Sequence, residues 1–268
     1  MNLADRMKLY EKQEAGRKTL PKLPVCVRLD GRSFSRWTKG LARPFDSRLT
    51  SLMLEVAKEL VQQSGAMLAY TQSDEITLVF YSENLTSQIF FDGKIQKLAS
   101  VLASIATATF NHLVPSFLPE KEGNLAHFDC RVWTVPTLIE AANVILWREQ
   151  DAVRNSVQMA AQALYGHKQL QNKNTSDLHE MLFQKDINWN DYPASFKRGT
   201  YVFRKVVERT LTPQEISQIP EKNRPDSSTK VVRSEYVATN LPPLREVTNP
   251  IDVLFLGAEP TFETSEDS

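Results

Sequence analysis

Hydrophobic and polar residues alternate along several short stretches of the first half of the chain. Apolar side chains occupy every second position in residues 23–29, which predicts a strand that is buried on at least one face. Comparable apolar runs predict strands at residues 67–71, 76–81 and 127–135. The polar residues between the second and third runs predict a hairpin turn.

A helical period of hydrophobic positions replaces this alternation in two longer stretches, residues 47–64 and 91–112. The predicted order up to residue 135 is therefore strand, helix, strand, strand, helix, strand. This is the ferredoxin-like pattern, in which the third strand lies between the first and the second. We expect an α+β fold of this type with added helices.

Outside this pattern, further helices are expected at residues 3–15 and 175–184, and residues 138–165 predict one long helix or two in tandem. A strand is expected at residues 201–207. Prolines become frequent beyond residue 210. We therefore predict a catalytic domain at 1–210 and a partly mobile C-terminal extension at 211–268. The extension would hold a mobile loop at 221–229, possible strands at 231–238 and 253–256, and a disordered acidic tail at 263–268.

Composition restricts the class of protein. The 268 residues carry 32 basic and 32 acidic side chains, so a nucleic-acid partner would have to meet a local basic surface. Two cysteines, Cys26 and Cys130, are too few for a disulfide framework and are expected to be free thiols in a reducing cytoplasm. The sequence has no secretory h-region at its start and no run near the roughly 20 apolar residues of a membrane span.

Three carboxylates are predicted to meet at one edge of the sheet. Asp30 and Gly31 end the first strand, and Asp74 and Glu75 lie at the tip of the hairpin. Because the first and third strands are antiparallel neighbours in the ferredoxin-like order, these ends lie side by side. Like charges this close favour a bound cation, and oxygen ligands favour Mg²⁺. The alternative is that Asp30 caps a turn and the hairpin acids are solvated.

These stretches resemble a known family. Residues 28–32 (Arg-Leu-Asp-Gly-Arg) and 72–75 (Gln-Ser-Asp-Glu) are similar to the signature of the tRNA-histidine guanylyltransferases, including their Thg1-like members. Further similar segments are 128–132 (Phe-Asp-Cys-Arg-Val), 147–151 (Trp-Arg-Glu-Gln-Asp) and 197–200 (Lys-Arg-Gly-Thr). The resemblance implies a polymerase-like palm with two Mg²⁺ ions that adds nucleotides to the 5′ end of tRNA in the 3′–5′ direction. The similar segments end near residue 204.

The resemblance also implies roles for single residues. Asp30, Asp74 and the Gly31 carbonyl would hold the metal ions, with Glu75 as a supporting catalytic carboxylate. The expected contacts to nucleotides or their triphosphates are Arg28, Arg32, Arg43, Lys94, Lys97, Arg131, Asn155 and Arg198. For the basic residues, the alternative is a solvated surface or, for Arg131, an ion pair with Asp129.

The implied reaction begins when ATP adenylylates the 5′-monophosphate of tRNA. The 3′-hydroxyl of GTP, or of another nucleotide, then displaces AMP, and the new 5′ end loses pyrophosphate. Eukaryotic members carry His-Ile-Asn-Asn-Leu-Tyr-Asn after the Trp-Arg segment. Here residues 153–158 read Val-Arg-Asn-Ser-Val-Gln, and only Asn155 matches. This difference implies a Thg1-like enzyme that copies a template in the acceptor stem.

Family members are commonly homotetramers, which would combine basic surface from several subunits and explain a neutral chain. A soluble, cytoplasmic tetramer without a membrane partner is therefore expected. Two other functions remain open from the sequence alone. A palm-fold nucleotide cyclase would use the same carboxylates without RNA, and a non-catalytic protein could bind RNA on a ferredoxin-like sheet, although this sheet lacks the paired aromatics of an RRM.

Overall fold

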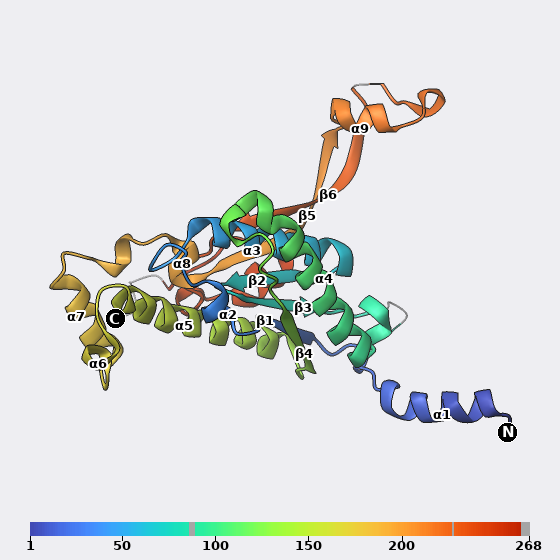
Figure 1. Cartoon of the computed structure of the whole chain (residues 1–268). Helices are drawn as coiled ribbons and strands as arrows, with labels where there is room; N and C mark the ends of the chain where they lie inside the picture. The colour runs from blue at the N-terminus through green and yellow to red at the C-terminus, as the bar shows by residue number, and fades with distance from the viewer. Residues whose placement is uncertain (86–88, 227, 264–268) are drawn as a thin grey trace.

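An antiparallel sheet organises the chain in the computed structural model, which describes residues 1–85, 89–226 and 228–263 (Figure 1). Its strands are β1 (Val25–Gly31), β2 (Leu68–Gln72), β3 (Glu75–Phe80), β4 (Phe128–Thr134), β5 (Thr200–Thr210) and β6 (Lys230–Thr239). They lie side by side in the order β4-β1-β3-β2-β5-β6. The order of β1 to β4 confirms the ferredoxin-like prediction, and β5 and β6 extend the sheet beyond β2.

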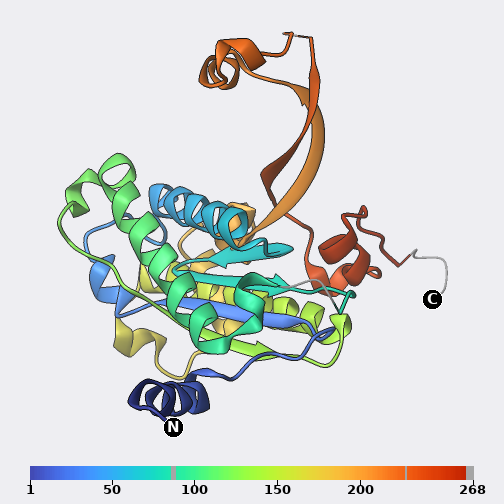
Figure 2. The same cartoon turned by 90° about the vertical axis from the view of Figure 1, so that its right-hand side faces the viewer.

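Helices cover both faces of the sheet. Helices α3 (Ser47–Ser64) and α4 (Ile95–Phe117) pack on one face, and α5 (Leu138–Gln162) packs on the other (Figure 2). Because neighbouring strand residues point to opposite faces, Val27 and Leu29 belong to the core under α3 and α4, whereas Cys26 belongs to the core under α5.

The two helices of the first face can be explained from their local sequence. Asp46 caps α3 by accepting a hydrogen bond from the Arg48 N–H, and Gly65 ends the helix at φ 70°. Helix α4 is long and apolar enough to cross a membrane by length and composition. One side of this helix packs in the core, because Leu98, Leu102, Ala106 and Phe110 are fully buried there.

Shorter elements complete the chain. The remaining helices are α1 (Leu3–Ala15), α2 (Phe34–Trp37), α6 (His167–Leu170), α7 (Thr175–Phe183), α8 (Ala194–Arg198) and α9 (Pro213–Gln218). Single 3₁₀ turns occupy Phe90–Gly93, Pro119–Lys121, Trp189–Asp191, Glu221–Asn223 and Leu244–Glu246. The helix expected at residues 3–15 is confirmed as α1, and the long helical region is the single helix α5. After Arg32 the chain forms the short helix α2, whose Phe34 and Trp37 pack on Phe110.

The C-terminal part of the chain differs from the prediction. Strand β5 pairs with β2 only as far as Phe203, and beyond this point β5 and β6 leave the body as a two-stranded arm with α9 near its tip (Figures 1 and 2). The strand expected at 231–238 therefore belongs to the main sheet and not to an appended subdomain. Residues 264–268 of the expected acidic tail, and Ser227 of the expected loop, lie outside the described residues.

The strand expected at residues 253–256 is wrong. This stretch lies within a π-helix, Asp252–Leu256, because a short apolar run does not by itself distinguish a strand from a buried helical turn. Leu254 and Phe255 pack in the same core as Tyr70 and Ile145. The residues after 240 therefore return to the body, and the expected boundary at 210 does not separate two packed units.

This packing predicts how the C-terminal segment contributes to stability. Leu254 is 1% exposed, and Leu256 in the same helical turn is 75% exposed. Leu254→Ala should lower the free energy of unfolding by about 2–4 kcal/mol through lost burial and a cavity. Leu256→Ala should change it by no more than about 0.5 kcal/mol. Urea unfolding of both variants measures the difference, and equal midpoints would contradict the docking of this segment on the core.

Candidate active site

The ends of β1 and β3 bring Asp30 and Asp74 together, as the strand order predicts. Asp30 pairs with Glu75 across the β1–β3 ladder, and the Gly31 N–H donates to the Asp74 carbonyl oxygen at 3.2 Å. Ser73 and Asp74 form the two-residue turn between β2 and β3, and Ser73 has a left-handed backbone with φ 53°. Since a turn of two residues has few conformations, it fixes the place of the Asp74 backbone.

Gly31 is required by the closeness of the two acidic ends. A Cβ atom at this position would lie 2.9 Å from Asp74 Oδ2 and 2.4 Å from a ring carbon of Phe34. Side chains do not tolerate such contacts, so only glycine lets the Asp74 carboxylate lie against the end of β1. The oxygen donors at this point are thus the carboxylates of Asp30 and Asp74 and the backbone carbonyl of Gly31.

The electrostatics of the pair favour a bound cation. Burial, and after it the negative charge of Asp30, raise the pKa of Asp74 to about 6. A divalent cation would relieve this repulsion, and the donors are all hard oxygen atoms, so the residues present fit Mg²⁺. Within the described ranges, no group of three or more His, Cys, Asp and Glu residues is placed to hold a metal ion.

Glu75 lies at the same edge and lines the same cleft as Asp30 and Asp74, as expected, but its carboxylate is held by an arginine. Arg148 of α5 donates from Nε to Glu75 Oε1 at 2.6 Å and from a terminal nitrogen to Oε2 at 2.9 Å. Arg28 Nε lies 3.9 Å from the same carboxylate. Burial raises the pKa of Glu75, and the hydrogen bonds from Arg148 oppose this shift. Glu75 is therefore a carboxylate already bound by a guanidinium, consistent only with a supporting role.

A cleft of about 330 Å³ opens over the pair. One side of α5 forms its wall, because Asn155, Gln158 and Gln162 recur at helical spacing and line it. A second hollow of about 330 Å³ adjoins the cleft and shares Ser73, Asp74, Met159 and Gln162 with it. The two hollows together offer room for a triphosphate beside the carboxylates and a nucleoside next to it.

Several expected nucleotide contacts lie around these hollows. Asn155 lines the cleft, and Arg43 lines the adjoining hollow. Arg131 is 53% exposed and holds only loose ion pairs, with 4.0 Å to Asp30 and 3.7 Å to Asp129. It could therefore exchange these pairs for a phosphate. Arg32 is exposed at the end of β1, whereas Arg28 is largely buried beside the Trp147 ring.

Lys94 and Lys97, which are expected to contact nucleotide triphosphates, lie at the end of the sheet opposite to Asp30 and Asp74. Helix α4 follows β3, and β3 ends where Phe80 pairs with Val25 at the start of β1. Lys97 lies over the Phe91 ring at 5.5 Å, and Lys94 precedes the first turn of α4. Within one chain, these lysines are separated from Asp30 by the length of β1.

Arg198, another expected triphosphate contact, is partly buried. Its Nε is buried and has no hydrogen-bond partner among the described residues, and its positive charge acts on the buried Glu149. Its carbonyl accepts a hydrogen bond from the Tyr70 hydroxyl at 2.7 Å. Lys197 is held as well, because its Nζ donates to the Asn190 carbonyl. This short basic segment therefore anchors α8 to the core.

The sequence reasoning missed the cleft residues Gln158, Met159 and Gln162 and the pairing of Arg148 with Glu75. The polar positions 155, 158 and 162 of α5 repeat at intervals of three and four, which is a detectable signal for one helix face. The contact between Arg148 and Glu75 has no such signal, because 73 residues separate the two partners.

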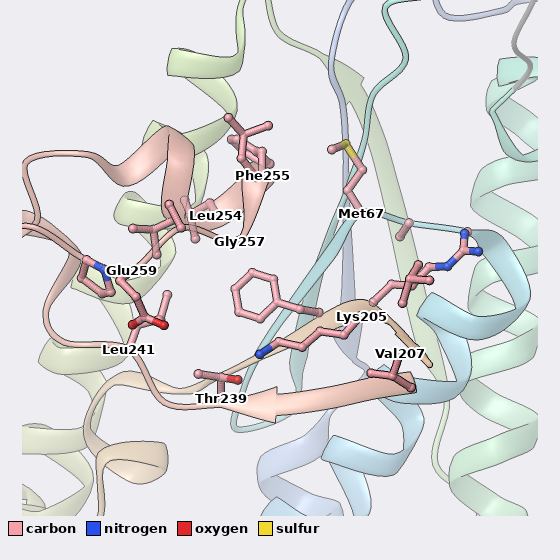
Figure 3. Close-up of a pocket in the computed structure, with 18 residues that line it drawn as sticks. Met67, Lys205, Val207, Thr239, Leu241, Leu254, Phe255, Gly257 and Glu259 are labelled. Atoms are coloured by element: carbon pink, nitrogen blue, oxygen red, sulfur yellow. The ribbon is translucent and has the colours of Figure 1, made fainter. Parts of the chain in front are cut away.

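A hollow larger than this cleft lies elsewhere, at the root of the arm (Figure 3). It measures about 640 Å³ and lies between β5, the end of β6 and the C-terminal π-helix. Phe203, Leu241 and Phe255 form apolar parts of its wall, and Lys205 contributes a charge. It contains no pair of adjacent acids, so the chemistry is assigned to the smaller cleft over Asp30 and Asp74.

The raised pKa of Asp74 predicts a pH-dependent stability in the absence of metal. Since the native pKa of about 6 exceeds the unfolded value of 3.8, the folded protein binds more protons between them, and its stability falls as pH rises through this window. Asp74→Asn should therefore raise the unfolding temperature in the presence of EDTA at about pH 7, and the gain should vanish near pH 4. Thermal unfolding across this range measures it, and a gain that does not change with pH would contradict the assignment.

Comparisons with known proteins agree with this arrangement. Residues 4–136 match the family model described as Thg1, tRNAHis guanylyltransferase. The chain is 30% identical to the tRNA(His) guanylyltransferase of Saccharomyces cerevisiae over 204 residues, which cover 69% of this chain and 84% of the relative. The enzyme of the same name from Neurospora crassa is 28% identical over 85% of this chain and 87% of its own length.

Solved structures are similar as well. A bacterial tRNA(His) guanylyltransferase (Thg1)-like protein in complex with ATP superposes with a TM-score of 0.78 at 36% identity, over 95% of this chain and 99% of that one. Such a protein in complex with GTP gives a TM-score of 0.71 at 36% identity, over 91% of this chain and 94% of that one. Similarity this extensive in both sequence and fold shows that the chain belongs to the tRNA-histidine guanylyltransferase family of nucleotidyltransferases.

Proposed function

We propose that this chain adds nucleotides to the 5′ end of tRNA and extends the strand in the 3′–5′ direction. The observation that carries the proposal is the pair Asp30 and Asp74 beside a cleft that can hold a triphosphate, in a member of a nucleotidyltransferase family. The similar bacterial proteins were solved with ATP and with GTP, and we assign these two nucleotides as substrates.

The reaction that fits these substrates has three steps. An oxygen of the tRNA 5′-monophosphate attacks the α-phosphorus of ATP, and pyrophosphate leaves. The 3′-hydroxyl of the incoming nucleoside triphosphate then attacks the activated 5′-phosphorus, loses its proton and displaces AMP. Hydrolysis finally releases pyrophosphate from the new 5′-triphosphate. Each step is an in-line displacement at phosphorus, for which positioning and charge stabilisation supply most of the catalysis.

Asp30, Asp74 and the Gly31 carbonyl would hold two Mg²⁺ ions, which when bound stabilise phosphoryl charge and acidify an attacking hydroxyl. The chain's own side chains would orient the substrates. Arg131 is free enough beside Asp30 to bind a phosphate oxygen. Asn155 and Gln158 present amides to the same cleft. The carboxylates would be sufficient to accept the proton that the attacking 3′-hydroxyl loses.

The adjoining hollow favours selection of the nucleotide by a template. The Asp46 carboxylate, the obvious group to read a base there, is 6% exposed and accepts hydrogen bonds from Arg48 and the Ala42 N–H. The side-chain hydrogen bond from Arg48 lowers the pKa of Asp46 to about 2. The ring of Phe45 stacks on that of Phe196, with 4.6 Å between the ring centroids. With these groups engaged, base pairing in the acceptor stem would decide which nucleotide is added.

The direct test uses tRNAs that lack the first 5′ nucleotide and carry each of the four bases opposite the gap. Each is incubated with ATP, Mg²⁺ and one labelled nucleotide. We expect the nucleotide that pairs with the opposing base to be added at least about a hundredfold faster than the others, since misplacement of the 3′-hydroxyl slows transfer on that scale. Addition of guanosine opposite every base would contradict templated selection.

Asp30→Ala and Asp74→Ala provide the controls for the chemistry. Each should reduce the rate of nucleotide transfer by more than about a hundredfold. The far-UV circular dichroism spectrum should stay unchanged, and unfolding should stay cooperative. Near-normal transfer by either folded variant would remove these residues from the catalytic role. A cyclic nucleotide formed from GTP alone would indicate a cyclase, and Mg²⁺-independent tRNA binding without turnover would indicate a binding protein.

We also propose that the protein acts as a homotetramer in the cytoplasm. No residue of α1 is buried in the single chain, and Leu3, Met7 and Tyr10 are exposed on it. Helix α1 projects beyond the end of the sheet at which α4 begins (Figure 1). Coverage of this end by another subunit would bury α1 and carry Lys94 and Lys97 toward the carboxylates of that subunit.

Mixed oligomers test this use of the lysines. Asp30→Ala and Lys97→Ala subunits, each with a different tag, are produced together and purified through both tags. If Lys97 serves the active site of another subunit, the mixed species should recover activity that neither variant shows alone, because an intact Asp30 can meet an intact Lys97. Mixed species no more active than the separate variants would contradict sharing between subunits.

A further inference from the structure

Arg148 holds the acidic residue that lies next to the proposed metal ligands. Two of its nitrogens donate to both oxygens of Glu75, at 2.6 and 2.9 Å, and its third lies 2.9 Å from Asp151 Oδ2. The side chains of Arg148 and Glu75 are only 8% and 14% exposed. The Trp147 ring covers the guanidinium at 4.5 Å. The pair is therefore bidentate, shielded from water and fixed on two sides.

The sequence of α5 brings Arg148 to this position. Thr137 caps the helix, and Ala141, Ile145 and Ala152 on its inner side are fully buried. Small side chains let the helix axis approach the sheet closely, so an arginine on this side reaches the backbone level of β3. Asp151 also pairs with Arg154, which lies about one helical turn further on and is exposed.

The position of Glu75 makes this contact important. Glu75 is the register partner of Asp30 across β1 and β3, and it follows Asp74 directly in the sequence. The negative charge of Asp30 acts on the Glu75 carboxyl. Without a partner, Glu75 would be a third carboxylate at an edge that already holds two, and it could turn toward a cation bound there.

We propose that Arg148 is a positioning residue that keeps Glu75 out of the metal site and sets the charge of that site at two carboxylates. The inference rests on the proposed function only in that the pair Asp30 and Asp74 binds a divalent ion. It assigns no contact between Arg148 and the reacting atoms. The charges predict the direction of each change in affinity for the ion. Loss of Arg148 makes the surroundings of the ion more negative by one charge, and loss of the Glu75 charge makes them more positive by one charge.

Binding of Mn²⁺ to the free protein, followed by its paramagnetic resonance signal, measures this effect without tRNA or turnover. Arg148→Gln should tighten Mn²⁺ binding by roughly tenfold, and Glu75→Gln should weaken it by roughly tenfold, as one charge at this range implies in a partly buried site. The double variant restores the balance of charge and should bind Mn²⁺ within about threefold of the original protein.

Arg154→Gln is the matched control. It removes the same charge from the same helix and the same network, but its side chain is 56% exposed, and its ion pair among the described residues is with Asp151. Screening by water should keep its effect on Mn²⁺ binding within about twofold. If Arg148→Gln does not fold, comparison of the double variant with Glu75→Gln still shows whether removal of Arg148 tightens binding.

The outcomes separate the possible roles. A merely structural contact would weaken Mn²⁺ binding in both single variants, and this result would overturn the proposal. Equal effects of Arg148→Gln and Arg154→Gln would overturn it too, because general charge and not the position of Glu75 would then act. Failure of Mn²⁺ to bind the original protein at all would refute the metal site itself, whereas normal Mn²⁺ binding without transfer to tRNA would refute only the proposed reaction.

Discussion

Antiparallel pairing of β1 with β3 places two carboxylates of like charge at one edge of the sheet, and the rest of the site depends on this constraint. The pairing is fixed by the core, because Val27, Leu29 and Ile76 are completely buried under α3 and α4. The fold thus stabilises an arrangement that is unfavourable by itself, since burial and then the charge of Asp30 both raise the pKa of Asp74. A bound divalent ion would convert this repulsion into affinity.

A second constraint separates neighbouring acids that would otherwise act alike. Asp74 belongs to the turn, and Glu75 is the first residue of β3, where the alternation of side chains gives it a fixed direction. Arg148 meets Glu75 there and neutralises it in a place from which water is largely excluded. Helix α5 therefore covers one face of the sheet, lines the cleft with amides and controls the charge beside the proposed ligands.

Much of this arrangement follows from the sequence because it depends on local periods and on the order of elements. The hydrophobic pattern and the strand order were sufficient to place Asp30 beside Asp74. Contacts between distant segments were not predictable in the same way, and the pair Arg148 and Glu75 is the clearest example. Lys94 and Lys97 differ from this pair, because they were selected by the resemblance alone. The order of the elements places the start of α4 at the end of the sheet opposite to Asp30 and Asp74.

In the proposed metal site, Asp30, Asp74 and the Gly31 carbonyl hold the ions while Glu75 stays bound to Arg148. Crystals of the protein grown with Mn²⁺ and a non-hydrolysable GTP analogue, measured at the manganese absorption edge, test it most directly. We expect anomalous peaks between Asp30 and Asp74, with both Glu75 oxygens still hydrogen-bonded to Arg148. Manganese coordinated by Glu75, or bound away from the two aspartates, would contradict it.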